Sequence, residues 1–285
     1  MKVAILNISI GNYFRFWELF YETSKVNFLP DTEKKYFVFT DKDKTELGNN
    51  SDVEYIFQEN LGWPFNTMKR FAMFERIKEQ LKNFDYIFFI NGNARFAETL
   101  DSNFISNSKN IITVQHPGFY RKDISEVPYE RRTESNACIP YGKGKFYVQG
   151  AFIGGKAEAF LNMVDELNKL TEDDIGKNII AVWHDESFLN KYIVDRDDVQ
   201  VLGAQYLGFE EYVHPYKAPI ILRSKRKNCD LNTFRNLSSK ENITLVKAKL
   251  FLKNCKEMLL ILIGIRKKLY WKDRTGKLIN FDINC

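Results

Sequence analysis

The stretch DYIFFINGNARF, residues 85–96, is a continuous apolar run that stops at two asparagines separated by a glycine. A run that is apolar on both faces is typical of a central strand in a parallel or mixed sheet, because helices cover both faces of such a sheet. Ligands of open α/β sheets bind at the carboxyl ends of the strands. Asn91, Gly92 and Asn93 are therefore candidate ligand-binding residues from their position alone.

The residues before this run alternate between strand and helix patterns. Segments 2–10, 34–41 and 53–59 are predicted strands, and residues 13–28 and 67–81 carry apolar side chains at helical spacing. Strands that alternate with helices favour an open α/β sheet. The first predicted strand is followed by NISIGNY, whose single glycine does not make the Gly-x-Gly-x-x-Gly turn of dinucleotide-binding enzymes.

The bulk composition is that of a globular protein, with 285 residues, 44% of them hydrophobic and 28% charged. The four cysteines lack metal-ligand spacing and are expected to be reduced thiols of an intracellular protein. The N-terminal MKVAILNISIG turns polar too early for a signal peptide or a membrane anchor. We therefore expect a cytoplasmic protein.

Positive charge is concentrated in the C-terminal tail, where residues 225–285 hold fifteen Lys or Arg against five Asp or Glu. We place a boundary between an α/β domain, residues 1–230, and a basic amphipathic helical extension, residues 231–285. Within segment 249–272, the uncharged run from Met258 to Ile265 is far shorter than the roughly 20 residues that span a bilayer. This segment is expected either to lie on an anionic membrane surface, at the inner face of the membrane, or to dock on the domain. A nucleic-acid partner is not expected, because no recognition motif accompanies the charge.

The run AVWHDESFLNKY, residues 181–192, places Trp183, Asp185 and Glu186 directly ahead of a helical pattern. An indole face stacks on the apolar face of a pyranose, while carboxylates bind hydroxyls or stabilise an oxocarbenium-like centre. The same run also fits a plain acidic helix start, in which either acid complements the helix dipole. A sugar site is the functional reading of this run.

Three further stretches have both a functional and a structural reading. His116 precedes a Pro-Gly turn, from which its ring can reach a cleft or stay structural. The strand pattern KFYVQGAFIGG, residues 145–155, ends in two glycines, which allow close approach to a ligand or simply a bulge. The segment ILRSKRKN, residues 221–228, can neutralise a diphosphate without a metal or can be a solvated basic run.

Taken together, these stretches resemble glycosyltransferase family 6, the family of the histo-blood-group A and B transferases and the α-1,3-galactosyltransferases. The resemblance extends over about residues 3–228 and rests on HPGFY, YERRTESNACIP, KFYVQGAFIGG and AVWHDESFLNKY. It implies the GT-A fold, a Rossmann-like nucleotide-sugar-binding α/β fold with a central mixed sheet. It also implies retaining transfer of galactose or N-acetylgalactosamine from its UDP derivative in α-1,3 linkage to a galactoside.

The resemblance also implies roles for individual residues. Glu186 is the catalytic carboxylate at the reacting face, either as nucleophile or as electrostatic support, and it shapes the acceptor site together with His116 and Trp183. A basic residue among Lys225, Arg226 and Lys227 meets the diphosphate. The implied donor-binding residues are Ile8, Ser9, Ile10 and Tyr13 around the uridine, with Arg70, Asn91, Gly92, Asn93 and Asp185, and with Gln149, Gly150 and Ala151 at the positions that distinguish the two donor sugars.

One departure from the family pattern changes the expected chemistry. Animal members carry Asp-x-Asp where this chain has Asn91-Gly92-Asn93, and neutral amides do not supply the anionic oxygens of a Mn²⁺ site. Amides still hydrogen-bond ribose and phosphate oxygens. The resemblance is therefore to the bacterial, metal-independent branch, with no cofactor and with Lys and Arg stabilising the leaving UDP.

The expected partners are UDP-galactose or UDP-N-acetylgalactosamine and a blood-group-like galactoside. Fucosylation and a lipid anchor of that acceptor are left open. A catalytically inactive sugar-binding relative is the alternative, although an intact Trp-His-Asp-Glu run favours catalysis because a simple binder has little need of Glu186.

Overall fold

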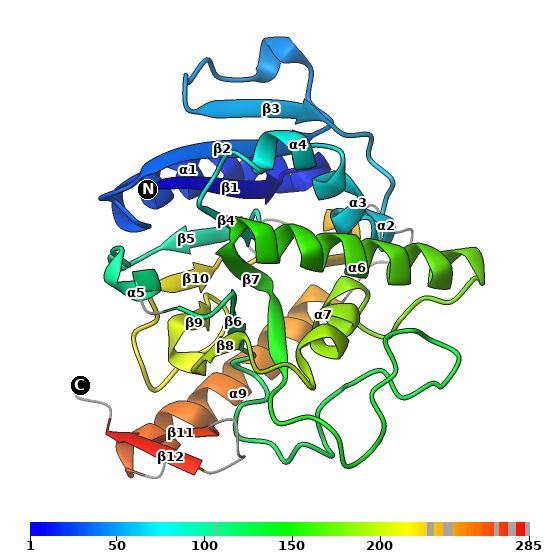
Figure 1. The fold of residues 1–285 in the computed structure, drawn as a ribbon. Coiled ribbons are helices and arrows are strands. Elements are labelled where there is room, and N and C mark those ends of the chain that lie inside the picture. Colours follow the sequence, from blue (N-terminus) through cyan, green and yellow to red (C-terminus); the bar gives the residue numbers. More distant parts are fainter. Residues whose placement is uncertain (107, 227–230, 236–241, 265–267, 273–277, 283–285) are drawn as a thin grey trace.

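A seven-stranded mixed sheet forms the centre of the protein (Figure 1). The computed structural model describes residues 1–106, 108–226, 231–235, 242–264, 268–272 and 278–282. The strand order is β3-β2-β1-β4-β7-β6-β8, which confirms the expected α/β fold with a mixed sheet. These strands are β1 (Lys2–Ile8), β2 (Glu33–Thr40), β3 (Val53–Phe57), β4 (Tyr86–Ile90), β6 (Ile111–Gln115), β7 (Val148–Lys156) and β8 (Val199–Leu202).

The apolar run that opened the sequence analysis forms β4, which is buried on both faces. Ile87 and Phe89 pack into one hydrophobic cluster, whereas Phe88 and Ile90 pack into the other. Helices α3 (Arg70–Glu75), α6 (Ala157–Gly176) and α7 (Asp185–Ile193) cover the first face, and α1 (Trp17–Asn27) covers the second. Figure 1 shows α6 crossing in front of the sheet and α1 behind it.

Strand β7 is the one that reverses direction in this sheet. It pairs antiparallel with β4 and with β6, whereas the other pairs are parallel. The Asn91 N–H, just beyond β4, donates to the Ala151 carbonyl near the start of β7 over 2.8 Å. The end of β4 and the beginning of β7 therefore lie together at one edge of the sheet.

The remaining elements are short connections and a C-terminal part. The predicted helix over 67–81 is divided by bends at Lys69 and Ile77, which keep Met68, Phe74 and Leu81 buried. The other elements are η1 (Gly11–Phe16), η2 (Lys44–Glu46), α2 (Phe65–Met68), α4 (Lys78–Leu81), β5 (Ala94–Phe96), α5 (Asn103–Ser106), η3 (Ala204–Tyr206), β9 (Leu207–Phe209), β10 (Ile220–Leu222), α8 (Leu231–Phe234), α9 (Ile243–Leu262), β11 (Lys268–Lys272) and β12 (Leu278–Asp282).

The C-terminal helices pack against the α/β domain. The Phe234 ring of α8 is 3% exposed and its centroid lies 4.9 Å from that of Tyr13. We expected a basic helix over residues 249–272. The helix that the structure shows, α9, begins earlier and runs from Ile243 to Leu262, and residues 268–272 form strand β11 instead. Gly264, at φ +82°, follows the last turn and provides the left-handed residue that commonly ends a helix.

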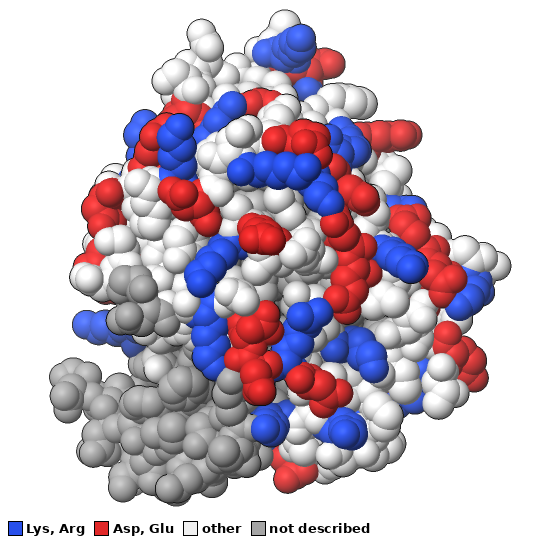
Figure 2. Space-filling view, viewed as in Figure 1, with Lys and Arg blue, Asp and Glu red and all other residues white. Residues whose placement is uncertain are grey.

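The charge on one face and the lengths of the helices concern two kinds of partner, polyanions and membranes. On the face shown in Figure 2, Lys and Arg are interspersed with Asp and Glu, so this face presents no continuous basic surface. Within the ranges that the structure describes, no helix is both long and apolar enough to cross a membrane.

Candidate functional site

Two adjoining cavities lie at the sheet edge where β4 ends and β7 begins. The inner cavity, of about 200 Å³, is enclosed by the ends of β1 and β4 and the starts of β7 and α7. The outer cavity, of about 830 Å³, lies between the turn at 116–122, residues 209–226 and α9. Both are lined by Asn91, Gln149, Trp183, Lys225 and Arg235, so molecules bound in the two cavities can meet.

Asp185 begins α7 as a buried, paired acid. Its Oδ2 lies 2.8 Å from Arg70 Nη1, and the same nitrogen donates to the Gly150 carbonyl over 2.7 Å. The Arg70 guanidinium also stacks over the Phe89 ring at 4.1 Å. Burial raises the pKa of Asp185, and the charge of Arg70 opposes that rise. The pair fixes a carboxylate at the floor of the inner cavity.

Glu186 is held by two hydrogen bonds from the β7 region. Its Oε1 accepts from the Tyr147 hydroxyl over 2.7 Å, and its Oε2 accepts from the Gly150 N–H over 2.8 Å. Burial raises the pKa of Glu186 to about 7, while these two hydrogen bonds limit the rise. A positioned acid with a pKa near neutrality, in a cavity, marks a site suited to catalysis.

The residue before these acids has an unusual backbone conformation. His184 has φ +52°, which costs a non-glycine residue about 1–3 kcal/mol and requires support from its surroundings. Its ring makes an edge contact with Trp63 at 5.0 Å between centroids, and burial lowers the pKa of His184 to about 4. This turn lets Asp185 and Glu186 both face the cavity from consecutive positions.

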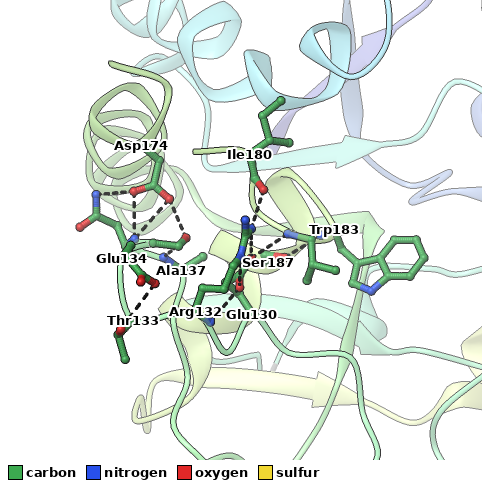
Figure 3. Close-up of polar contacts among 12 residues, drawn as sticks. Glu130, Arg132, Thr133, Glu134, Ala137, Asp174, Ile180, Trp183 and Ser187 are labelled. Atoms are coloured by element: carbon green, nitrogen blue, oxygen red, sulfur yellow. Dashed lines mark hydrogen bonds and ion pairs between the residues drawn. The ribbon is translucent and has the colours of Figure 1, made fainter. Parts of the chain in front are cut away.

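A network behind α7 supports this turn (Figure 3). The buried Glu130 carboxylate accepts from the Val182 N–H over 2.8 Å and from Arg132, which also donates to the Ile180 carbonyl. Burial works against ionisation of Glu130, yet these donors hold its pKa at about 2. Figure 3 shows the Trp183 ring directed away from this network, and its side chain is 47% exposed.

The turn formed by Asn91, Gly92 and Asn93 is held by hydrogen bonds to other protein groups. Asn91 Nδ2 donates to Asn93 Oδ1 over 2.9 Å, and Asn93 Nδ2 donates to the Arg223 carbonyl over 2.6 Å. The Arg223 N–H returns a bond to the Asn93 carbonyl over 2.8 Å. A Cβ on Gly92 would lie 2.7 Å from the Ile8 carbonyl oxygen, so only glycine fits between the two strand ends.

A metal site does not fit this turn. Both polar atoms of the Asn93 amide are already used by protein groups, and neither asparagine offers an anionic oxygen. Over the part of the chain that the structure describes, no group of three or more His, Cys, Asp or Glu side chains is placed to hold a metal ion.

The described cations of the basic cluster predicted at 223–227, which are Arg223, Lys225 and Arg226, all line the outer cavity. Lys225 lines both cavities, with its Nζ 5.0 Å from the Tyr13 ring centroid. Arg226 forms an ion pair with Glu211 at 3.3 Å. Lys227 lies outside the described residues. Lys225 is therefore the best-placed cation of this cluster.

Most, but not all, of the other predicted donor-binding residues line the inner cavity. Residues Ile8, Ile10 and Tyr13, together with residues 149–151, line the inner cavity. Ser9 does not line it, because this residue is 0% exposed and its hydroxyl donates to Asn7 Oδ1 over 2.6 Å.

His116 lines the outer cavity as a neutral side chain. Its Nδ1 accepts from the Gly118 N–H over 2.9 Å, and burial lowers its pKa to about 3. The remaining proton of a neutral ring then sits on Nε2, which makes His116 a hydrogen-bond donor. Trp183 lines both cavities, whereas Glu186 lines the inner one.

The sequence reasoning missed several residues of the site. Tyr147 lies two residues before Gln149, so the period-two pattern of a strand could have placed it on the same face. Trp63 precedes α2, and Arg235, whose guanidinium lies 4.7 Å from the Trp63 ring, comes from beyond the proposed boundary at 230. No local pattern pointed to either residue.

An open α/β sheet with a cavity at its strand ends, two adjacent carboxylates, an exposed indole and nearby cations fits a site for sugar transfer. Comparison with known families agrees, since the model of glycosyltransferase family 6 matches residues 1–236. The chain belongs to glycosyltransferase family 6.

Relatives of this chain occur in bacteria and in vertebrates. It is 35% identical over 227 residues to the O-antigen biosynthesis glycosyltransferase WbnI of Escherichia coli, covering 80% of this chain and 96% of that protein. It is 29% identical over 212 residues to the histo-blood group ABO system transferase 2 of Rattus norvegicus, with 72% and 63% coverage. The globoside alpha-1,3-N-acetylgalactosaminyltransferase 1 of Gallus gallus is 27% identical over 219 residues, with 73% and 62% coverage. The chain thus spans less than two thirds of these two vertebrate relatives.

Proposed function

We propose that this protein is a metal-independent, retaining transferase that moves galactose or N-acetylgalactosamine from its UDP derivative to a galactoside in α-1,3 linkage. The observation that carries the proposal is Glu186, fixed by Tyr147 and Gly150 at the inner cavity beside the Asp185–Arg70 pair. The names of the bacterial O-antigen relative and of the vertebrate relatives support a glycan acceptor.

The donor occupies the inner cavity in this proposal. The uridine lies against the end of β1, near Ile8, Ile10 and Tyr13, and the sugar lies against residues 149–151 and Asp185. Ala151 narrows the pocket relative to glycine and favours galactose, whereas the polar Gln149 can serve an acetamido group. Both donors therefore stay in the proposal.

The leaving UDP is stabilised by side-chain cations. Lys225 and Arg235 line the junction of the two cavities, where the diphosphate of a donor in the inner cavity would lie. The Asn91 amide contributes hydrogen bonds to ribose or phosphate. Asn93 remains a proposed donor-binding residue through the outer cavity, which it lines, and its bond to the Arg223 carbonyl anchors the segment that carries Lys225.

Bond cleavage places positive charge on the sugar ring next to Glu186. An ionised carboxylate at that point stabilises an oxocarbenium-like centre or attacks it, and either route retains the anomeric configuration when the acceptor enters from the same face as the departing UDP. The acceptor comes from the outer cavity, where the Trp183 face can stack on a pyranose and neutral His116 can donate to a hydroxyl.

UDP release tests the proposal. UDP-galactose and UDP-N-acetylgalactosamine are each incubated with lactose and with 2′-fucosyllactose, with and without excess EDTA. We expect acceptor-dependent UDP release from at least one donor that is unchanged by EDTA. Loss of activity in EDTA that Mn²⁺ restores would overturn metal independence. Donor binding without UDP release would support the inactive sugar-binding alternative.

A further inference from the structure

One face of helix α9 is attached to the α/β domain and borders the outer cavity. Asn254 accepts from the Val213 N–H over 3.1 Å and donates to the Glu211 carbonyl over 2.9 Å. Glu257, one turn further, forms an ion pair with Arg121 at 3.2 Å. Asn254 and Glu257 line the outer cavity, so this face of α9 forms one of its walls.

The opposite face of α9 and the turn after it expose a stripe of large apolar side chains. Successive positions along a helix are about 100° apart, which gathers these residues into one stripe. Leu252 and Leu259 lie opposite Asn254 and Glu257, whereas Phe251 and Met258 form the margin of the stripe that is next to Asn254. Each residue of the stripe is half exposed or more, and Leu262 reaches 77%. The stripe consists of Leu245, Phe251, Leu252, Met258, Leu259, Leu262 and Ile263.

Lysines border this stripe along both of its edges. By the same helical geometry, Lys247 lies on one edge, and Lys249 and Lys256 lie on the other. The single acidic residue of α9, Glu257, belongs to the attached face. The outward surface is therefore an apolar band of about 30 Å with cationic margins and no acidic group.

We propose that this face of α9 lies in the interfacial region of a bilayer that contains anionic lipids. Apolar side chains then enter the headgroup and acyl boundary, while the bordering lysines reach the anionic headgroups through their flexible stems. The charge pattern favours a membrane over a protein partner, because lysine is depleted at protein–protein interfaces.

The position of α9 gives membrane binding a consequence for the acceptor. Since the same helix forms a wall of the outer cavity, the cavity would lie beside the headgroups, within reach of a glycan carried on a lipid. This consequence rests on the proposed function, whereas binding of α9 to lipid does not.

Vesicle flotation with the full chain tests the proposal. The probes are vesicles of phosphatidylglycerol with phosphatidylethanolamine and vesicles of phosphatidylcholine alone. We expect binding to the anionic vesicles that weakens with salt, and much weaker binding to the neutral ones. The double variant Leu252→Asp/Leu259→Asp should bind the anionic vesicles at least about tenfold more weakly. Lys249→Gln/Lys256→Gln should lose roughly tenfold on anionic vesicles and little on neutral ones.

A matched control separates the stripe from general surface hydrophobicity. Val26 on α1 is 66% exposed and remote in sequence from α9, so Val26→Asp should bind vesicles like the parent. A cooperative thermal unfolding transition checks folding, and we expect all variants to keep the melting temperature of the parent, because each substituted side chain is exposed and lines neither cavity. Absence of vesicle binding, or equal binding by the Leu252→Asp/Leu259→Asp variant, would overturn the proposal. A parent dimer that the double Asp variant dissociates, without lipid binding, would show that a second copy covers the stripe. Neither result affects the UDP-release test.

Discussion

Replacing Tyr147 by Phe tests whether ionisation of Glu186 controls the rate. The Tyr147 hydroxyl donates to Glu186 Oε1 over 2.7 Å, and this bond favours the ionised carboxylate. The substitution removes the hydroxyl and keeps the ring, so the Gly150 N–H is left as the other donor. A hydrogen bond to a charged group contributes about 1.5–3 kcal/mol, and one pKa unit corresponds to about 1.4 kcal/mol. The pKa of Glu186 should therefore rise from about 7 by roughly one to two units.

The measurement is kcat/KM for UDP release as a function of pH. In the parent we expect activity to fall as the pH drops below about 7, because the carboxylate becomes protonated. In Tyr147→Phe this acidic limb should move to higher pH by roughly one to two units. The control is Tyr129→Phe, whose hydroxyl donates to the Phe146 carbonyl and does not touch Glu186. This control should lower the melting temperature and leave the limb in place. An unmoved limb in Tyr147→Phe would refute the link between Glu186 and the rate.

Three other substitutions test separate parts of the site. Glu186→Gln should lower kcat by roughly 10³-fold with little change in UDP affinity, and a near-normal rate would remove this residue from its role. The pKa of Glu186 is about 7 in the folded protein against an ordinary 4.5, so ionisation of Glu186 destabilises the folded parent as the pH rises above 4.5. The Glu186→Gln variant does not ionise there. It should therefore melt at a higher temperature than the parent at pH 8 and at the same temperature below about pH 4.5. Asn93→Asp places a carboxylate against the Arg223 carbonyl and should cost about 1–3 kcal/mol in chemical denaturation without creating Mn²⁺ dependence; a Mn²⁺-stimulated rate would contradict this. Ala151→Gly widens the inner cavity and should shift the ratio of kcat/KM values toward UDP-N-acetylgalactosamine, and an unchanged ratio would exclude Ala151 as a selector.

The fold could be predicted because its signals are local. The run that forms β4 is apolar at consecutive positions since its side chains enter two different clusters, and this pattern alone indicated a central strand. The acidic start of α7 and the strand β7 could likewise be predicted from short stretches of sequence.

The details of the site depended on contacts between distant segments. The Asn93 amide donates a hydrogen bond to the carbonyl of Arg223, 130 residues away, and no local sequence pattern indicates that partner. The family resemblance placed Ser9 beside the uridine, yet tertiary packing leaves this residue 0% exposed and outside the lining of the inner cavity. Arg235 lines both cavities from the turn that follows α8, a segment that a boundary drawn from composition had separated from the domain.

The reversal of β7 explains why the two asparagines and the two acids meet. In the antiparallel register Ile90 pairs with Phe152, so the residues after β4 face the first residues of β7. A parallel strand in the same place would bring its end, rather than Gln149 and Gly150, to this edge. The Gly150 N–H then holds Glu186, and the Gly150 carbonyl holds Arg70, which pairs with Asp185. A Cβ on Gly150 would lie 3.3 Å from both Asp185 Oδ2 and Glu186 Cβ, so a side chain there would press directly on the two acids. Two consecutive residues at the start of β7 thus join these groups, since Ala151 bonds the strand end at Asn91 and Gly150 bonds Glu186 and the Arg70 partner of Asp185.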